Sequence, residues 1–216
     1  MFKKILAQLA PSKTKLVAVS KTKPADAILA LYDQGQRMFG ENRVQELVGK
    51  QEALPKDIEW HFIGHLQTNK VKHIAPFVHF IHAIDSLKLL QEVNKQAARN
   101  GRVIDCLLQF HIAEEESKYG LDETEARQLL ESAAFPDFEN IRIAGVMGMA
   151  TFTNDLIQVR REFQQLKRIF DQLKSEYFAE KVQFKEVSMG MSGDYEIAIE
   201  EGSTMVRIGT LLFGKR

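Results

Sequence analysis

Short apolar or β-branched runs alternate with longer amphipathic stretches along the whole chain. Eight of these runs have the length and residue types of buried strands. They lie at Leu16–Ser20, Arg37–Gly40, Trp60–Ile63, Phe80–Ala83, Val103–His111, Ile143–Met147, Phe184–Ser188 and Thr204–Ile208. Regular alternation of strands and helices indicates βαβ units with a parallel sheet.

The stretches between the predicted strands carry recognisable helix ends. Asn42 with Gln45, and Asp122 with Glu125, have the spacing of capping boxes, in which each side chain bonds the other residue's backbone amide. Residues 154–177 form the longest amphipathic pattern, with an apolar stripe at helical spacing. We therefore expect helices between the predicted strands.

Eight strand–helix units predict an α/β fold, a single closed (β/α)8 TIM barrel that spans residues 1–216 as one domain. An open, doubly wound sheet is the alternative, because ligands meet the carboxyl ends of the strands in both folds. Only residues 211–216 follow the last predicted strand, too few for a full eighth helix. We expect the amphipathic start of the chain, with Ile5, Leu6 and Leu9, to cover that gap.

Charge and cysteine content narrow the possible functions. The 29 lysines and arginines equal the 29 aspartates and glutamates, so no overall field attracts nucleic acid or an anionic membrane. The single cysteine, Cys106, lies in an apolar run and excludes a disulfide framework. No apolar run is long enough to cross a bilayer, and the apolar start is too short for a signal peptide. We therefore expect a cytoplasmic protein that binds neither nucleic acid nor membranes.

The segment "AVSKTKP" places a lysine at the end of the first predicted strand. The alternation Val17, Val19, Lys21 puts the amine on the same face as two buried-type valines. An amine directed into an interior is costly unless it is paired, neutral or covalently bonded. Lys23 brings a second positive charge, which would favour the neutral, nucleophilic form of Lys21. This arrangement suggests Schiff-base chemistry at Lys21, and a solvated lysine-rich loop is the alternative.

Two polar, glycine-containing loops follow the last two predicted strands. "SMGMSG" offers glycines and the hydroxyl of Ser192, and "RIGT" offers the amide of Gly209 and the hydroxyl of Thr210. Barrels often bind phosphate at the loops after strands seven and eight. The two loops together predict a phosphate site, although each alone resembles an ordinary turn.

Arg207 is expected to point into the barrel, because Val206 and Ile208 face the helices. A fixed guanidinium could contact a polar atom of a cofactor, since arginine stays charged. A salt-bridged arginine that closes the barrel is the alternative.

A metal site is not expected. His61 and His65 lie four residues apart, but they straddle a strand and a glycine turn instead of sharing a helix face. His82 and His111 also lie near strand ends, without the spacing of a ligand pair.

Six motifs occur in order along the chain: "AVSKTKP", "FGENRVQE", "WHFIGHLQTNK", "EESKYG", "SMGMSGD" and "STMVRIGTLLFG". Together they resemble the pyridoxal phosphate homeostasis proteins, the YggS/PROSC family, from about Leu16 to the C-terminus. The resemblance implies a barrel like the N-terminal domain of alanine racemase, with pyridoxal 5'-phosphate (PLP) as cofactor. It also implies roles for seven cofactor-binding residues: Lys21 for the Schiff base, Ser192, Gly209 and Thr210 for the phosphate, Arg207 for the pyridine nitrogen, and Asn42 and Met147 for the pocket lining.

Two functions remain open for such a protein. One is intracellular PLP homeostasis, in which a carrier with little or no turnover buffers the cofactor or delivers it to PLP-dependent apoenzymes. The other is a PLP-dependent amino-acid racemase or related enzyme, which needs a base on each face of the substrate α-carbon. Tyr119 and Tyr195 lie in rim loops, and no motif marks either as that second base. We favour the carrier. We also expect a monomer, because the dimer-forming domain of racemases does not follow the barrel.

A sugar-phosphate isomerase would use the same phosphate loops. It would leave Lys21 without a covalent partner, and we favour it least.

Overall fold

The computed structural model describes residues 1–115 and 119–214. Its eight strands are β1 (Lys15–Val19), β2 (Met38–Glu41), β3 (Glu59–Phe62), β4 (Phe80–Ile84), β5 (Ile104–Phe110), β6 (Ile141–Gly148), β7 (Glu186–Ser188) and β8 (Met205–Ile208). The helices are α1 (Phe2–Leu9), α2 (Ala25–Tyr32), α3 (Val44–Ala53), α4 (Val71–Ile74), α5 (Leu87–Arg99), α6 (Glu123–Leu130), α7 (Leu156–Glu176), α8 (Tyr195–Glu200) and α9 (Thr210–Phe213), with short 3-10 turns at Thr68–Lys70 and Phe135–Asp137.

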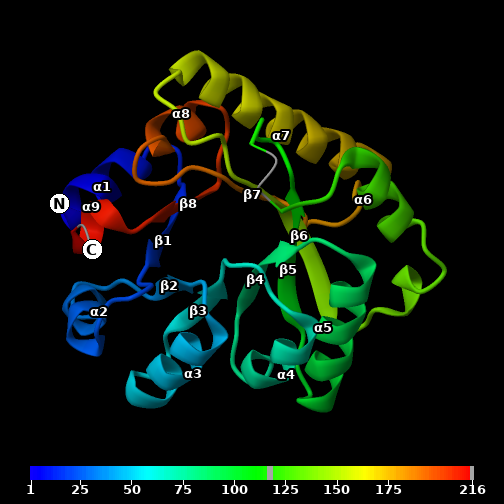
Figure 1. Cartoon of the computed structure of the whole chain (residues 1–216), viewed down its shortest axis with the longest axis horizontal. Helices are drawn as coiled ribbons and strands as arrows, with labels where there is room; N and C mark the ends of the chain where they lie inside the picture. Colours follow the sequence, from blue (N-terminus) through cyan, green and yellow to red (C-terminus); the bar gives the residue numbers. More distant parts are fainter. Residues whose placement is uncertain (116–118, 215–216) are drawn as a thin grey trace.

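The strands form a closed parallel barrel in the order β1 to β8, which confirms the (β/α)8 prediction (Figure 1). Closure depends on the pairing of β1 with β8, where Val17 lies opposite Arg207 and Ala18 opposite Ile208. An open doubly wound sheet would lack this pairing, so that alternative is excluded.

Two apolar layers pack the barrel. The larger lies between the strands and the surrounding helices and includes Leu16, Ala18, Val206 and Ile208. The smaller fills the inside of the barrel, with the members Val17, Phe80, Leu107, Ala144, Met147 and Met205. The alternation along β1 and β8 is therefore the one that the sequence predicts: alternate residues face the helices and the barrel interior.

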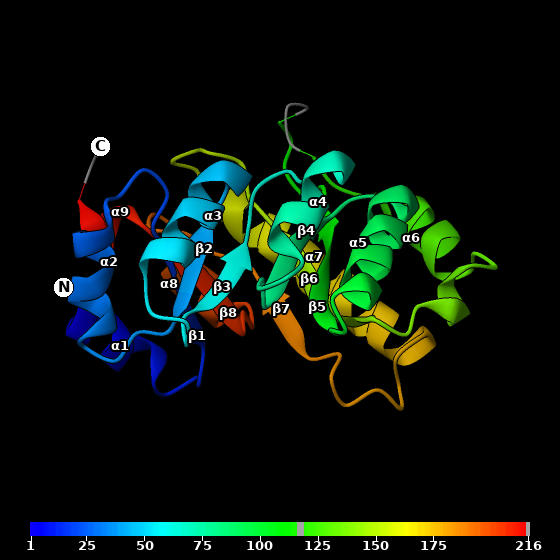
Figure 2. The same cartoon turned by 90° about the horizontal axis from the view of Figure 1, so that it is seen from below.

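Helix α1 packs against the barrel through Phe2, Ile5 and Leu9, which are all buried. It also reaches α8, where Gln8 Nε2 donates to Glu196 Oε1 at 2.9 Å. After β8 the described chain forms the four-residue α9, and α1 and α9 lie on the same side of the barrel in Figures 1 and 2. The start of the chain thus covers the barrel as expected, but Leu6 is exposed, so its predicted part in that contact is wrong.

One of the two predicted capping boxes forms. Asp122 Oδ1 accepts from the amide of Glu125, and Glu125 Oε2 accepts from the amide of Asp122, so the box at α6 is confirmed. The box at Asn42 is wrong: α3 begins after Arg43 and has no side-chain cap.

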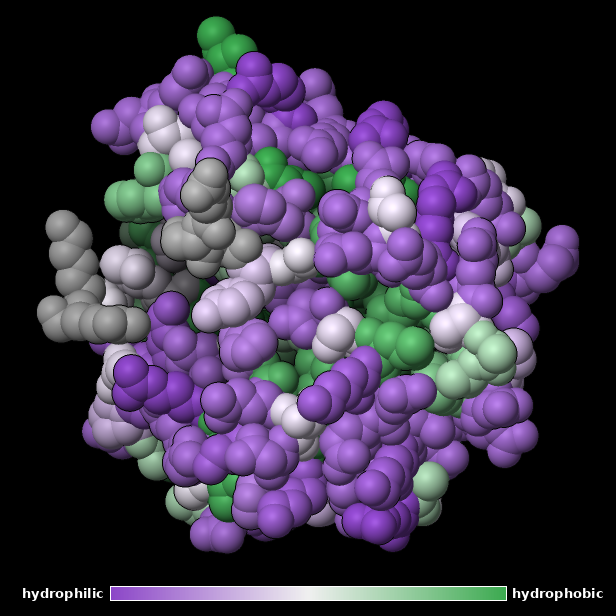
Figure 3. Space-filling view, turned by 45° about the vertical axis from the view of Figure 1, so that its right-hand side comes forward, coloured by the Kyte–Doolittle hydropathy of each residue, from purple (hydrophilic) through white to green (hydrophobic). Residues whose placement is uncertain are grey.

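Hydrophilic residues cover most of the face in Figure 3, and hydrophobic residues show mainly in recesses between them. Among the helices of residues 1–115 and 119–214, none has the length and apolar character that a bilayer crossing requires.

Candidate functional site

A cavity of about 780 Å³ opens at the carboxyl ends of the strands. This volume is within the range of small-molecule sites, and this end of a barrel is where ligands bind. The cavity is lined by six of the residues that the sequence singles out, from the ends of β1, β2, β7 and β8: Lys21, Asn42, Ser192, Arg207, Gly209 and Thr210. The structure therefore brings together segments that lie far apart in the sequence.

Met147 is the exception. It is fully buried in the apolar interior of the barrel and does not line the cavity. Met147 belongs to the apolar cluster inside the barrel and Met149 packs against that cluster, so both side chains face inward and Met147 lies deeper. Met149, two residues further on, lines the cavity instead, so the predicted pocket-lining role of Met147 is corrected to Met149.

Lys21 lies two residues beyond the end of β1 and is half-buried in the cavity wall. Its amine has neither a hydrogen bond nor an ion pair among the described residues. The neighbouring Thr22 has a φ of +64°, which is strained for a β-branched residue. Its amide donates to Glu46 on α3, and this contact holds the strained turn in place.

A buried ion pair fixes the other side of the same turn. Lys50 Nζ on α3 lies 2.6 Å from Glu41 Oε1 and donates to the carbonyl of Ser20 at 2.8 Å. The hydroxyl of Ser20 donates to Glu41 Oε1 at 2.6 Å. Burial raises the pKa of Glu41, and its bonds from Lys50 and Ser20 oppose that shift. The residues on both sides of Lys21 are thus anchored while its own side chain is left to the cavity.

Sequence reasoning missed Glu41, Glu46 and Lys50. The first two lie within the motif "FGENRVQE", in which roles are predicted for Asn42 and Gln45 but not for these residues. Lys50 follows Glu46 at i+4 on α3, the spacing of a helical ion pair, and this was the available signal.

Lys23 does not have the role that the sequence predicts, which is to favour the neutral form of Lys21. Its ammonium donates to the carbonyls of Phe213 and Gly214 at 3.0 and 3.2 Å, at the C-terminal end of α9. Cations stabilise that end of a helix. Lys23 does not line the cavity, so we withdraw its assignment as the charge that activates Lys21.

The loops after β7 and β8 meet at the cavity. The amide of Gly209 donates to the hydroxyl of Ser192 at 3.3 Å. A Cβ on Gly209 would approach the carbonyl of Val19 to 3.1 Å, so close packing of β8 on β1 also requires this glycine. Thr210 is exposed and lines the cavity beside them. This arrangement offers an amide and two hydroxyls to an anion, while Asp194 contributes a carboxylate to the same wall.

Arg207 is 3% exposed and lines the cavity from the barrel interior. Its Nη1 donates to Ser188 Oγ at 2.7 Å and its Nη2 to the carbonyl of Gly148 at 3.0 Å. Burial lowers the pKa of Arg207 to about 10, and the charge of Asp194 opposes this shift. The guanidinium therefore stays protonated at neutral pH. No ion pair with it is found in the described part of the chain, so the salt-bridged alternative does not apply there.

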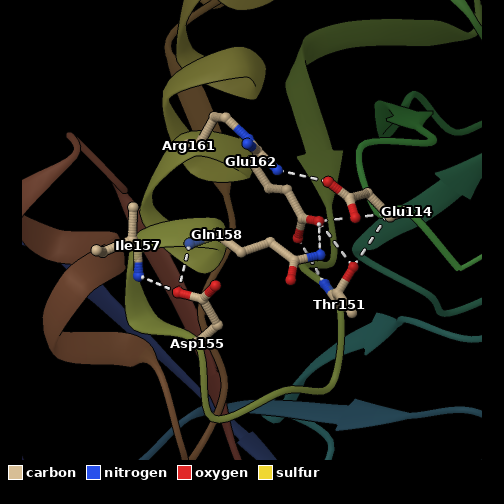
Figure 4. A network of polar contacts seen from close by, with 7 residues as sticks. All are labelled: Glu114, Thr151, Asp155, Ile157, Gln158, Arg161 and Glu162. Atoms are coloured by element: carbon tan, nitrogen blue, oxygen red, sulfur yellow. Dashed lines mark hydrogen bonds and ion pairs between the residues drawn. The ribbon is translucent and has the colours of Figure 1, made fainter.

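Glu162 on α7 holds two loops at the rim of the cavity (Figure 4). This buried carboxylate accepts from the amide of Thr151 at 2.6 Å, from the hydroxyl of Thr151 at 2.7 Å and from the amide of Glu114 at 3.3 Å. Asp155 begins α7 by accepting from the amides of Ile157 and Gln158. Sequence reasoning missed Glu162, because it lies in the middle of the long helical pattern.

The histidines do not gather at one site. His61 and His82 are hydrogen-bonded to each other inside the barrel, whereas His65 lies at the cavity and bonds Asp85 at 3.2 Å. His111 contacts the carbonyl of Glu115. Within residues 1–115 and 119–214, no group of three or more histidine, cysteine, aspartate or glutamate side chains could hold a metal ion.

Tyr119 and Tyr195 differ in position. Tyr119 lines the cavity, is 59% exposed and stacks on His65 with ring centroids 4.4 Å apart. Tyr195 is buried, and its hydroxyl donates to Gln8 on α1 at 2.9 Å. Most of the motif "EESKYG" before Tyr119 lies outside the described residues.

The alanine racemase N-terminal domain family matches residues 3–216. The pyridoxal phosphate homeostasis protein of Aquifex aeolicus is 43% identical over 203 residues, which cover 94% of this chain and 87% of that protein. The human protein of the same name is 41% identical, with 94% of this chain and 76% of its own length covered. The chain belongs to the pyridoxal phosphate homeostasis protein family.

Solved structures of the family agree with the fold. PipY of Synechococcus elongatus, solved without PLP, has a TM-score of 0.91 and 35% identity, with 99% of this chain and 98% of that chain covered. PipY with PLP bound has a TM-score of 0.86. Alanine racemase of Bartonella henselae, 17% identical, has a TM-score of 0.73, and 59% of that chain is covered. At this identity the last match shows a shared barrel alone.

Proposed function

We propose that this protein binds PLP through a Schiff base to Lys21 and acts in intracellular PLP homeostasis. The observation that carries this proposal is the amine of Lys21, which has no partner among the described residues and shares one cavity with Arg207 and the loops after β7 and β8. PLP presents an aldehyde, a phosphate and a pyridine nitrogen. Lys21 can react with the aldehyde, the two loops can bind the phosphate, and Arg207 can donate to the pyridine nitrogen. PipY, a 35% identical relative, has been solved with PLP bound.

Lys21 would hold the aldehyde end of the cofactor. When bound, PLP supplies a carbonyl carbon with which Lys21 Nζ forms a C=N bond, and the carbonyl oxygen leaves as water. The turn that carries Lys21 is anchored at Ser20 and Thr22, so the amine is directed at the cavity before the cofactor arrives.

The phosphate end would lie against the loops after β7 and β8. The hydroxyls of Ser192 and Thr210 and the amide of Gly209 can donate to phosphate oxygens. The Gly209 amide and the Ser192 hydroxyl are 3.3 Å apart, so a phosphate oxygen beside both groups could accept from both. Asn42 lines the same cavity, where it can contact the ring or its substituents.

Slow or absent turnover is part of this proposal. Arg207 stays protonated and can only donate, so it favours an unprotonated pyridine nitrogen and weakens the ring as an electron sink. A racemase also needs a second base opposite Lys21. Tyr119 is the tyrosine that lines the cavity, and its ring stacks on His65 at the open mouth. We therefore favour a carrier of PLP over an amino-acid racemase.

Absorbance spectroscopy tests the binding step. Protein incubated with PLP should turn yellow, and borohydride should bleach that colour because it reduces a C=N bond. A colourless protein that borohydride leaves unmodified would contradict the proposal. Racemisation or transamination of a common amino acid at rates on the order of 10 s⁻¹, typical of enzymes, would contradict the carrier role.

The cellular role needs a separate measurement. Protein loaded with PLP should restore activity to a PLP-dependent apoenzyme, whereas the same protein reduced with borohydride should not. The monomeric state and the cytoplasmic location stay predictions, which light scattering and cell fractionation can check.

A further inference from the structure

A buried row of polar side chains crosses the inside of the barrel. His61 Nδ1 lies 2.9 Å from His82 Nε2, and His82 Nδ1 lies 3.0 Å from Ser188 Oγ. Ser188 Oγ in turn accepts from Arg207 Nη1 at 2.7 Å. We call the three residues His61, His82 and Ser188 the interior chain. It ends at the one arginine that lines the cavity in the described part of the protein.

The interior chain connects strands that are not neighbours in the barrel. His82 is on β4 and Ser188 is on β7, so their bond spans the interior instead of following the sheet. Both side chains are fully buried, and His61 is 2% exposed. His61 also lines a second cavity, of about 320 Å³, on the other side of the barrel from Arg207.

The chemistry of arginine gives these bonds a direction. Arg207 can only donate, so Ser188 Oγ is an acceptor there and keeps its own proton for another partner. Among the described residues, the remaining partner of Ser188 Oγ is His82 Nδ1. A buried hydroxyl proton without an acceptor is costly, so we assign the unprotonated, accepting state to that nitrogen. The proton of a neutral His82 is on Nε2 and is donated to His61 Nδ1, which places the proton of His61 on Nε2.

Both rings are suited to stay neutral. Burial lowers the pKa of His61 to about 3, with smaller contributions from the charges of His79 and Lys15. Burial also lowers the pKa of His82 well below its usual value, and the charges of His61 and Arg207 act in the same direction. A neutral ring has one donor and one acceptor, as the directed chain requires.

We propose that the interior chain positions Arg207, so that the guanidinium directs its remaining N–H groups at the ring nitrogen of PLP. This inference rests on the proposed function for the identity of the ring. Arg207 has no carboxylate within ion-pair distance in the described residues, so the Ser188 hydroxyl and the Gly148 carbonyl are the contacts that set its orientation. Without the Ser188 hydroxyl, Arg207 Nη1 loses the hydrogen bond that orients it.

Histidine tautomers in the cofactor-free protein test the direction of the chain. Long-range ¹H–¹⁵N spectra of protein with ¹⁵N-labelled histidine should show His61 and His82 both protonated on Nε2 alone. In Ser188→Ala, His82 loses the donor to Nδ1, and a second tautomer should appear. The Arg207 Nε–H signal should shift in the same variant. A wild-type His82 protonated on Nδ1 would overturn the directed chain.

Binding of [¹⁵N-pyridine]PLP tests the positioning role. In Ser188→Ala the ring ¹⁵N signal should move, and the affinity for PLP should fall by about 5- to 30-fold, as expected for one lost buried hydrogen bond. Ser188→Thr keeps the hydroxyl and should restore both. Ser203→Ala removes an equally buried hydroxyl that contacts only backbone carbonyls among the described residues, and it should change neither.

The outcomes separate the two proposals. An unchanged ring signal and affinity in Ser188→Ala would overturn the positioning role, as would equal losses in Ser203→Ala. Wild-type protein that binds no PLP would contradict the proposed function. The tautomers of the histidines and the Arg207 signal in the cofactor-free protein would still decide whether the interior chain holds the guanidinium.

Discussion

Strand β1 carries a lysine near each end of the barrel interior, and the two side chains have different surroundings. Lys15, at the N-terminal end, pairs with Glu186 at 2.5 Å. Lys21, just beyond the C-terminal end, has no partner among the described residues and lines the larger cavity. Each lysine lines a cavity, Lys15 the smaller one and Lys21 the larger one.

This difference shows that position on an inward face does not by itself make a lysine reactive. At the N-terminal end, charges are neutralised within the protein: Lys15 by Glu186, and Arg142 by Asp105 at 2.6 Å. At the C-terminal end, the anchoring contacts go to the residues beside Lys21, and the amine itself is left for a ligand. Barrel enzymes place chemistry at this end and stability at the other, and β1 follows that division.

Replacing the two lysines in turn should give the largest contrast. Lys21→Ala should abolish the yellow absorbance and the borohydride-trapped product completely, because Lys21 is the only lysine in the cavity wall within residues 1–115 and 119–214. Lys15→Met should retain both, since its methionine keeps most of the aliphatic stem. Absorbance titration with PLP measures this directly. If Lys21→Ala retained the borohydride-trapped product, or if Lys15→Met lost it, the contrast between the two lysines would be wrong.

Removing the lysine that anchors the turn should cost stability. Lys50→Met leaves the fully buried Glu41 without its ion-pair partner, which lowers the free energy of unfolding by about 3–5 kcal/mol. Lys167, with Asp171, forms a helical pair of the same i,i+4 spacing at the surface, and Lys167→Met should cost about 0.5 kcal/mol or less. Urea unfolding compares the two variants. Equal costs would show that the Glu41 cluster does not stabilise the turn.

Acid should destabilise the barrel interior. The pKa of His61 and that of His82 are lower in the folded state than in the unfolded chain, so the unfolded chain binds more protons as pH falls below about 6.5. The free energy of unfolding should therefore fall as the pH drops from about 6.5 toward about 3, by about 1.4 kcal/mol per pH unit for each ring. Urea unfolding between pH 7 and pH 5 measures the slope.

Two variants identify the source of that slope. His61→Gln should reduce it by the contribution of one ring, and replacement of the exposed His73 by Gln should leave it unchanged. A slope that is the same in His61→Gln and in the wild type would remove His61 as a cause.

The smallest expected effect concerns the phosphate loops. Thr210→Val removes a hydroxyl without a large change in shape and should weaken PLP binding by about 10-fold, the low end for one hydrogen bond to a charged group, because Thr210 is exposed. Unphosphorylated pyridoxal should bind this variant about as well as it binds the wild type. Equal weakening of both ligands in equilibrium dialysis would show that Thr210 does not contact the phosphate.

The sequence predicts the barrel and most of the cavity, because alternation along β1 and β8 decides which side chains point inward. Asn42 was expected both to cap a helix and to line the pocket; it caps no helix but lines the cavity, since tertiary position outweighs a local capping pattern. Met147 faces the barrel interior but lies deeper than the cavity, and the depth of a side chain along an inward-facing strand cannot be read from the residues. The partners of Lys15 and Arg207 come from distant segments, so no local pattern reveals them.

Mapping the reduced adduct in the wild-type protein tests the central claim most directly. Protein saturated with PLP, reduced with borohydride and digested should give one pyridoxyl-modified peptide, with the label on Lys21 and none on Lys15, Lys23 or Lys50. Mass spectrometry measures the site and the stoichiometry, which should approach one per chain. A label on another lysine, or one spread over several lysines with Lys21 not preferred, would contradict the account.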